Sequence, residues 1–249
     1  MTARSLSTSL LVAGLALGLS GPLAAAEGRF TFARDVRVGT PSGEQRPVSN
    51  SETQDSARAA LYRGEQIETG VAGNARWWMV DESQFALARG STFRIDDYQT
   101  PRGSEGAGVA RYTLVKGAFR SISGTIGKRS GDRYVVTTSR AELLVNGTDF
   151  WVIDCRGNCR VPGMAAVKDG LYVGVNEGEV TVSNAEGRLV LQAGQSALVA
   201  SPPVLIDAPA VYAMFAADLS LGGGGGGGGG TGPEIILDPP VIEPPVSPN

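Results

Sequence analysis

Side chains that could carry out catalysis are sparse, because none of the 249 residues is a histidine. Without histidine, the sequence cannot build a Ser-His-Asp triad, a Cys-His pair or a histidine-ligated metal. Asp81-Glu82 and Asp96-Asp97 come closest to the paired carboxylates that serve glycoside hydrolysis or calcium binding. Adjacent acids in turn-bounded strands are usually exposed charges, so we expect these four to be solvated rather than catalytic.

Two other features could in principle bind a ligand. Residues 124–130 (GTIGKRS) share the composition of a phosphate loop, but the spacing departs from G-x4-G-K-S and the flanks favour strands, which predicts a solvated turn. Trp77, Trp78 and Trp151 are expected in the core or on a sheet face, rather than as a ligand platform. We therefore predict no catalytic, cofactor-binding or metal-binding residue, no cofactor and no enzymatic activity.

The two cysteines, Cys155 and Cys159, are separated by three residues. In an exported chain such a close pair is expected to form a local disulfide. Two cysteines cannot supply the four ligands of a structural zinc site, and the spacing differs from the C-x-x-C redox motif. We predict a structural link across a small loop.

The first 26 residues have the features of a secretory signal peptide. Arg4 precedes an apolar run at residues 10–19, and Ala24-Ala25-Ala26 offers a signal-peptidase site, so we expect cleavage after Ala26. The run is shorter than the roughly 20 residues of a membrane span, and we expect no integral span after cleavage. The net charge of −3 argues against nucleic acid as a partner. We expect a periplasmic, secreted or cell-surface protein.

The most regular strand pattern lies in residues 134–152, which are rich in Val, Thr, Tyr, Phe and Trp. These residue types favour the half-buried surface of a sheet. Asn146-Gly147 interrupts the stretch with the dipeptide that best tolerates a positive φ. We expect two strands here, with a turn or bulge at Gly147 that directs Phe150 into the core.

Short strands recur along the chain about every 8–12 residues, separated by Gly, Asn or Asp. This spacing predicts an all-β fold of stacked short strands, similar to a β-solenoid or β-sandwich. Nine consecutive glycines and a Pro-rich acidic segment then predict a disordered tail. The expected divisions are a signal peptide (1–26), an N-terminal strand and polar loop (27–61), the β domain (62–200), a short C-terminal helix (201–221) and the tail (222–249).

Seven short motifs, in the order in which they occur, resemble those of the FecR family of periplasmic domains. Residues 64–70 (GEQIETG) resemble its G-D-x-I-x-T-G motif, and residues 135–150 resemble V-x-T-x-x-A-x-V-x-V-x-G-T-x-F. Glu82 departs from the family, whose turn usually reads D-G-S. The matched residues, to which we assign structural roles, are Gly64, Thr69, Gly70, Asp81, Ser83, Gly117, Val145, Gly147, Thr148, Phe150, Gly178 and Gly194.

The resemblance implies an all-β domain outside the cytoplasm. In well-known members this domain passes a signal from an outer-membrane receptor to an inner-membrane anti-sigma segment. Here an export signal stands where that segment and its membrane span would be, so we expect a freestanding exported domain. We predict a non-enzymatic binding, scaffold or signal-relay module whose partner is an unidentified protein of the bacterial cell envelope. The alternatives are a component of sigma/anti-sigma signalling that works with a separate partner, and a carbohydrate-active enzyme.

Overall fold

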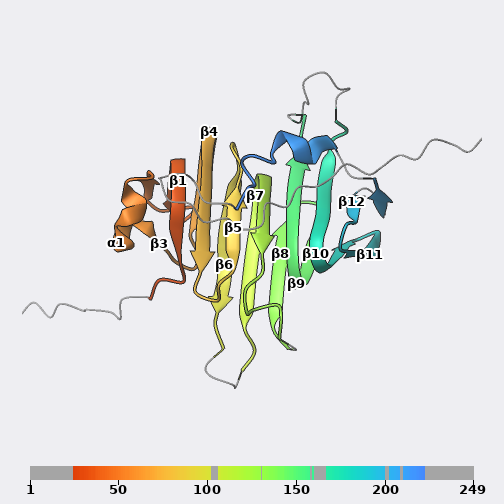
Figure 1. Cartoon of the computed structure of the whole chain (residues 1–249), viewed down its shortest axis with the longest axis horizontal. Helices are drawn as coiled ribbons and strands as arrows, with labels where there is room; N and C mark the ends of the chain where they lie inside the picture. The colour runs from red at the N-terminus through yellow and green to blue at the C-terminus, as the bar shows by residue number, and fades with distance from the viewer. Residues whose placement is uncertain are drawn as a thin grey trace, which may run out of the picture.

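The protein is built almost entirely from β-strands, as the sequence predicts. A computed structural model describes residues 25–101, 106–129, 131–157, 159, 167–199, 202–207 and 210–221. Its thirteen strands belong to one hydrogen-bonded sheet (Figure 1). The all-β prediction is confirmed, whereas the predicted tail and all but the last two residues of the predicted signal peptide lie outside the described residues.

Six strands form the N-terminal part of the sheet, followed by seven that form the rest. The first six are β1 (Gly28–Gly39), β2 (Gln45–Val48), β3 (Ala60–Leu61), β4 (Gln66–Met79), β5 (Gln84–Leu87) and β6 (Thr92–Gln99). The others are β7 (Val109–Ile122), β8 (Arg133–Thr138), β9 (Glu142–Cys155), β10 (Gly170–Asn184), β11 (Gly187–Gln192), β12 (Ser196–Val199) and β13 (Pro203–Ile206).

The long strands pass through two layers, because each pairs with different neighbours along its two halves. β4 pairs with β6 through Gln66–Glu68 and with β5 through Ala75–Trp78. β7, β9 and β10 change neighbours in the same way. Layer A contains β3, β5, β12 and β13, and layer B contains β2, β6, β8 and β11. The long strands join the layers, so the single sheet folds over itself as a β-sandwich.

Aromatic rings from both layers fill the space between them. In layer A, Trp77 stacks on Phe85 with ring centroids 4.9 Å apart. Tyr112 of layer B meets Phe85 edge-on at 5.1 Å, and Phe93 of layer B lies 5.0 Å from Phe119 of layer A. All five side chains are fully buried. Their large apolar areas make this cluster the main source of hydrophobic stabilisation.

The bulge expected in β9 is present at Gly147, which has a φ of +61°. The β9–β10 register shifts on either side of Glu177, opposite this point. Leu143 and Val145 lie before the bulge and Phe150 after it, and all three are buried despite the change from odd to even positions. An extra residue in one strand changes which side chains face the core, which explains the altered alternation.

Two parts of the chain differ from the expected divisions. The short C-terminal helix predicted within residues 201–221 is not an α-helix: that segment contains β13 and a 3-10 helix, η2 (Ala210–Met214). Apolar residues 204–206 directly follow Pro203, and such a sequence suits an edge strand. The polar segment before residue 62, expected as a loop with a helical turn at residues 56–61, contains that turn as α1 (Ser56–Ala59). It also contains β2 and a 3-10 turn (Glu52–Gln54), which were not expected. Asp55 caps α1 by accepting a hydrogen bond from the Ala57 amide at 2.8 Å.

Two buried tyrosines make the fold sensitive to alkaline pH. Burial raises the pKa of Tyr112 and Tyr134 well above the ordinary value of 10.0. In the unfolded chain both phenols lose protons near pH 10, whereas the folded state keeps them, so stability present below pH 10 is lost as pH rises. We expect the free energy of unfolding to fall by up to about 1.4 kcal/mol per tyrosine for each pH unit above 10.

Denaturant titrations at successive alkaline pH values, followed by circular dichroism, measure this slope. Tyr134→Phe removes one of these two fully buried phenols and should make the slope shallower. Phenolate absorbance from both buried rings appearing before any loss of strand signal would contradict the expectation.

Candidate functional site: buried pins and an open sheet edge

The hydroxyl groups of Thr69 and Ser91 stabilise the first corner of the sandwich, the point at which β4 passes from one layer to the other. Thr69 Oγ1 donates to the Ala88 carbonyl at 2.6 Å and accepts from the Ser91 amide at 2.9 Å. Ser91 Oγ in turn accepts from the Ala118 amide at 2.9 Å. Gly117 has a φ of +89°, and a Cβ there would lie 2.1 Å from Ser91 Oγ. The close approach and the backbone conformation both require glycine.

Asp81, which the sequence predicts to be solvated, is buried instead, because its carboxylate ties the turn after β4 to the segment that follows β7. Its Oδ2 accepts from Ser83 Oγ at 2.8 Å and from the Ile126 amide at 3.1 Å. Ser83 Oγ accepts from the Gly124 amide at 2.8 Å, and the Thr125 amide donates to the Asp81 carbonyl at 2.8 Å. The first amides of the phosphate-loop-like segment are therefore already bonded within the protein, so they are not free to bind phosphate.

Thr148 and Gly178 hold the corner at which β9 and β10 bend. Thr148 Oγ1 donates to the Glu179 carbonyl at 2.8 Å, and its amide donates to Ser123 Oγ at 2.8 Å. Gly178 has a φ of +81°, and a Cβ there would lie 2.2 Å from the Gly147 carbonyl oxygen. Backbone therefore packs against backbone at this corner.

The other glycines of the family motifs lie in turns or at close approaches. Gly64 (φ +83°) and Gly194 (φ +80°) adopt the left-handed conformation, with open space where a Cβ would be. At Gly70, a Cβ would lie 1.7 Å from the Asp35 carboxylate. Glu82, which replaces the usual glycine of the D-G-S turn, retains the positive φ of that position at +72°.

The acids that could have formed a catalytic pair are bonded to other groups. Asp96 accepts from Arg94 and, at 2.6 Å, from Thr113 Oγ1. Asp97 accepts from Arg63 at 3.4 Å. In the part of the chain that the structure describes, no three His, Cys, Asp or Glu side chains are grouped so that they could hold a metal ion.

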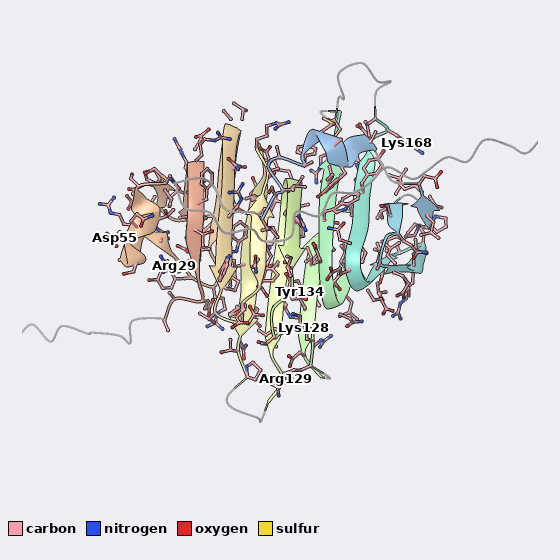
Figure 2. All side chains as sticks on the ribbon, viewed as in Figure 1. Arg29, Asp55, Lys128, Arg129, Tyr134 and Lys168 are labelled. Atoms are coloured by element: carbon pink, nitrogen blue, oxygen red, sulfur yellow. A yellow bond between two sulfur atoms is a disulfide. The ribbon has the colours of Figure 1, made fainter. Side chains whose placement is uncertain are left out.

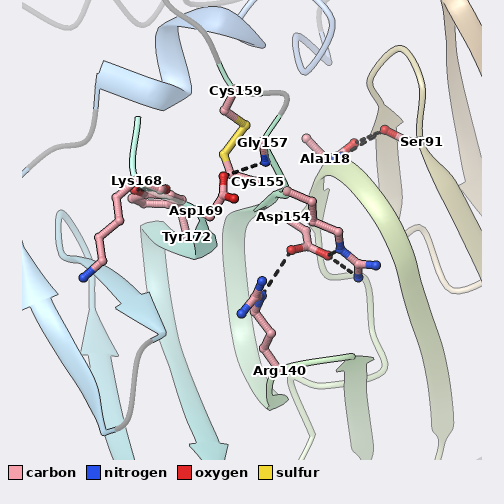
Figure 3. Close-up of a disulfide and its surroundings, with 11 residues drawn as sticks. Ser91, Ala118, Arg140, Asp154, Cys155, Gly157, Cys159, Lys168, Asp169 and Tyr172 are labelled. Carbon is pink, nitrogen blue, oxygen red and sulfur yellow. Dashed lines mark hydrogen bonds and ion pairs between the residues drawn. A yellow bond between two sulfur atoms is a disulfide. The ribbon is translucent and has the colours of Figure 1, made fainter. Parts of the chain in front are cut away.

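The cysteines form the expected disulfide, at the end of β9 (Figure 3). Cys155 and Cys159 are both buried in an apolar cluster on the outer face of layer A. The neighbouring Asp154 carboxylate is buried and binds Arg156 at 2.7 Å and Arg140 at 3.5 Å. These contacts hold the base of the cysteine loop against β7 and β8.

Reducing this disulfide is expected to lower the free energy of unfolding by about 2 kcal/mol, since a loop this short restricts the unfolded chain only modestly. Urea midpoints measured with and without a thiol reductant give the difference. The double variant Cys155→Ser, Cys159→Ser should be insensitive to reductant. Identical midpoints for the natural chain in both buffers would contradict the expectation.

The C-terminal segment covers the outer face of layer A and completes this second apolar cluster. In Figure 1 its blue helix η2 lies across the ends of β9 and β10. Tyr212 packs on Trp151 with ring centroids 4.9 Å apart, and Val211 and Phe215 belong to the same cluster. Asp218 binds Arg89 at 2.7 Å. These contacts fasten residues 210–220 to the sandwich.

An open cleft of about 990 Å³ contains the predicted signal-peptidase site. Ala26 is exposed and lines the cleft together with Glu27, Arg63 and Tyr98. Burial raises the pKa of the Glu27 carboxyl, and the charge of Arg63 opposes that rise. Cleavage after Ala26 stays a prediction, and it would leave Glu27 as the first residue.

The two ends of the sheet differ in how their edge strands are protected. At the N-terminal end, β2 carries Arg46 and Pro47, which discourage further strand pairing. At the C-terminal end, β13 consists of Pro203 followed by Val204, Leu205 and Ile206. Within the described residues β13 pairs only with β12, so its outer side carries unpaired backbone groups.

The position of Pro203 shows which backbone groups of β13 face outward. Proline has no N–H, so Pro203 cannot donate a hydrogen bond to β12. The Val199–Pro203 pair is therefore of the non-bonded type. Antiparallel pairs alternate between bonded and non-bonded, so the N–H and C=O of Leu205 also face outward. The Leu205 side chain is 52% exposed and that of Val204 is 43% exposed. A partner strand added here would find hydrogen-bonding groups and apolar side chains together.

A cleft of about 600 Å³ adjoins this edge. It is lined by Gly194, Gln195, Ser196, Leu205, Ile206 and Asp207. Its polar lining could orient the end of a bound segment.

Comparison with known proteins identifies a domain within the chain. Residues 65–181 match the family model described as FecR protein. This part of the chain is a FecR domain. The FecR domain thus spans β4 to the middle of β10, and the chain adds β1, β2 and β3 at one end of the sheet and β11, β12 and β13 at the other. The open edge at β13 therefore lies beyond the FecR match.

Solved structures similar to this chain include two crystal structures of a putative anti-sigma factor from Parabacteroides distasonis. Both are 16% identical to it, with TM-scores of 0.45 and 0.44. The similarity covers 61% and 60% of this chain, but less than two thirds of those chains, at 64% and 62%. No curated protein matches. No helix among the described residues of this chain is long and apolar enough to span a membrane.

Sequence reasoning placed Trp77 and Trp78 in the core or on a sheet face without distinguishing between them. Trp77 and Trp78 are adjacent on β4, so alternation alone requires that one of them face outward. Trp77 is fully buried and Trp78 is 51% exposed. The edge strand β13 was missed, although residues 204–206 are three consecutive apolar residues bounded by Pro203 and Asp207. Both signals were present in the sequence.

Proposed function

We propose that this chain is a non-enzymatic, exported module that relays a signal or assembles a complex by binding an envelope protein at the open edge of β13. The bound element is an extended segment that adds to the sheet as a further strand. Residues 1–26 support export, and the match to the FecR family supports a role in signal relay. The observation that carries the proposal is the unpaired outward backbone of Leu205, together with the exposed side chains of Val204 and Leu205.

Strand addition fits this edge better than it fits the opposite one. The backbone groups of the edge supply affinity, and side chains at alternate positions supply specificity. The exposed side chains of Val204 and Leu205 favour a partner strand with apolar residues. β2 presents charge and proline instead. The partner is therefore expected to engage the C-terminal end of the sheet.

A proline substitution tests the proposal at the backbone level. Leu205→Pro removes an N–H that faces outward, so the bonds between β12 and β13 remain and the melting temperature should change little. Loss of one hydrogen bond and the steric block of the ring should reduce capture of the partner about tenfold. The measurement is cross-linking of the tagged full chain in its host, followed by fractionation and quantification of the captured band.

Leu205→Ala is the matched control, because it keeps the N–H and removes only the side chain. We expect it to retain more of the capture than Leu205→Pro. Capture that is unchanged in Leu205→Pro would contradict binding at this edge. A captured band consisting of a second copy of this chain would show edge-to-edge self-association instead.

A further inference from the structure

The outer faces of β1 and β4 in layer A form a strip of arginine and aromatic side chains. The strip consists of Arg29, Phe32, Arg34, Arg76 and Trp78. Arg29 pairs with Trp78 and Phe32 pairs with Arg76 across the two strands, and Arg29 is labelled on β1 in Figure 2. The Arg76 guanidinium lies 5.1 Å from the centre of the Phe32 ring. Trp78 is half exposed at one end of the strip, beside Arg29.

This arginine–aromatic strip has an excess of positive charge. Burial lowers the pKa of Arg76, and the nearby charge of Arg34 lowers it further. The charge of Asp218 opposes that shift, but Asp218 also binds Arg89 at 2.7 Å. The three arginines of the strip therefore have few acidic neighbours. An additional acidic group beside the strip would be attracted to them.

The described chain ends directly beside this strip. The Ser220 carbonyl accepts a hydrogen bond from Arg76 Nε at 2.6 Å, and Leu221 is the last described residue. Trp78 lies two residues beyond Arg76 on the same strand, a distance of about 7 Å. The nine glycines that follow Leu221 span on average about 16 Å by the statistics of glycine-rich chains. The segment after them can therefore reach any part of the strip.

The sequence of that segment complements the strip chemically. Residues 231–249 contain Glu234, Asp238 and Glu243 and no basic residue. Two Pro-Pro pairs, at 239–240 and 244–245, favour the polyproline II conformation, which binds aromatic surfaces at little entropic cost. Trp78 and Phe32 offer such a surface, and the arginines beside them can pair with the acids.

We propose that the acidic, proline-rich tail of residues 231–249 binds the arginine–aromatic strip of its own chain. The nine-glycine segment tethers the tail beside the strip, which raises its effective concentration there and favours the intramolecular contact. In this state the tail covers Trp78. The tail contact is independent of the β13 edge, because it uses the opposite end of layer A.

Photo-cross-linking in the complete exported chain tests the tail contact. A benzophenone amino acid at Val241 should form cross-links within one chain, to peptides that contain residues 29–34 or 76–80. The double variant Arg29→Glu, Arg34→Glu should reduce this yield about tenfold, since it replaces attraction to the acids of the tail with repulsion. Lys128→Glu, an exposed charge reversal on a distant turn, should leave the yield unchanged.

Two further readouts separate the proposal from a folding defect. The melting temperature of the double variant should match that of the natural chain, because Arg29 and Arg34 are exposed. In the natural chain, raising the salt concentration from 50 to 500 mM should lower the yield, because salt screens exposed ion pairs. Cross-links that map elsewhere on the domain, that join two chains, or that are unaffected by the arginine substitutions would overturn the proposal.

Discussion

Trp77→Ala is expected to lower the free energy of unfolding by about 3–5 kcal/mol, the range for removal of a buried aromatic side chain. The Trp77 ring is fully buried, stacks on Phe85 at 4.9 Å and lies 5.5 Å from Phe93 and 6.2 Å from Phe30. These rings come from β1, β5 and β6, so the cavity would open at the centre of the sandwich. Typical domains have only about 5–15 kcal/mol of total stability, so the variant would retain little of it.

Denaturant titration of both proteins measures this difference. Trp78→Ala is the matched control, because it removes the same side chain from the next residue of the same strand. Trp78 is half exposed, so its loss should cost far less than that of Trp77. Equal losses for the two variants would show that Trp77 is not the centre of the core.

Gly178→Ala is expected to lower the free energy of unfolding by about 3 kcal/mol or more. The φ of +81° costs an alanine roughly 1–2 kcal/mol on its own. The new Cβ would also lie 2.2 Å from the Gly147 carbonyl oxygen, and backbone atoms cannot move aside without shifting β9. Both costs act at the corner where β9 and β10 pass between the layers.

Thermal and denaturant unfolding of three glycine variants separates the two costs. Gly194→Ala has a similar φ with open space around the added Cβ, so it reports backbone strain alone. Gly147→Val adds a bulky branched side chain at a φ of +61°, with its nearest neighbour 3.5 Å away on the flexible Lys128 side chain. We expect Gly178→Ala to be the least stable of the three. Equal stability of Gly178→Ala and Gly194→Ala would contradict the close approach at this corner.

Much of the fold could be predicted from the sequence, because strand composition and glycine placement are local signals. The Asn146-Gly147 dipeptide predicts the bulge, and the structure shows Val145 and Phe150 buried on either side of it. Asp96 and Asp97 are partly exposed and bonded to neighbouring side chains, which agrees with the expectation that they are not a catalytic pair. Which strands pair is not a local property, so the folding of one sheet into two layers could not be derived.

The candidate binding edge was harder to predict for a physical reason. An edge strand is defined by the absence of a pairing strand on one of its sides. The sequence of β13 alone does not show which strands lie beside it. Residues 201–221 have helical spacing of Val211, Met214 and Phe215, which favoured a helix over the four-residue strand before it. In the structure, tertiary packing on Trp151 holds this segment as a 3-10 turn instead.

The most direct test of binding at the β13 edge is photo-cross-linking in living cells. A benzophenone amino acid replaces Leu205 on β13 in one strain and Gln45 on β2 in another, within the otherwise natural chain. The proposed strand addition predicts a cross-link from position 205 to a separate envelope protein, and none to that protein from position 45. Cross-links to the same protein from both positions, or from position 45 alone, would contradict the proposed function.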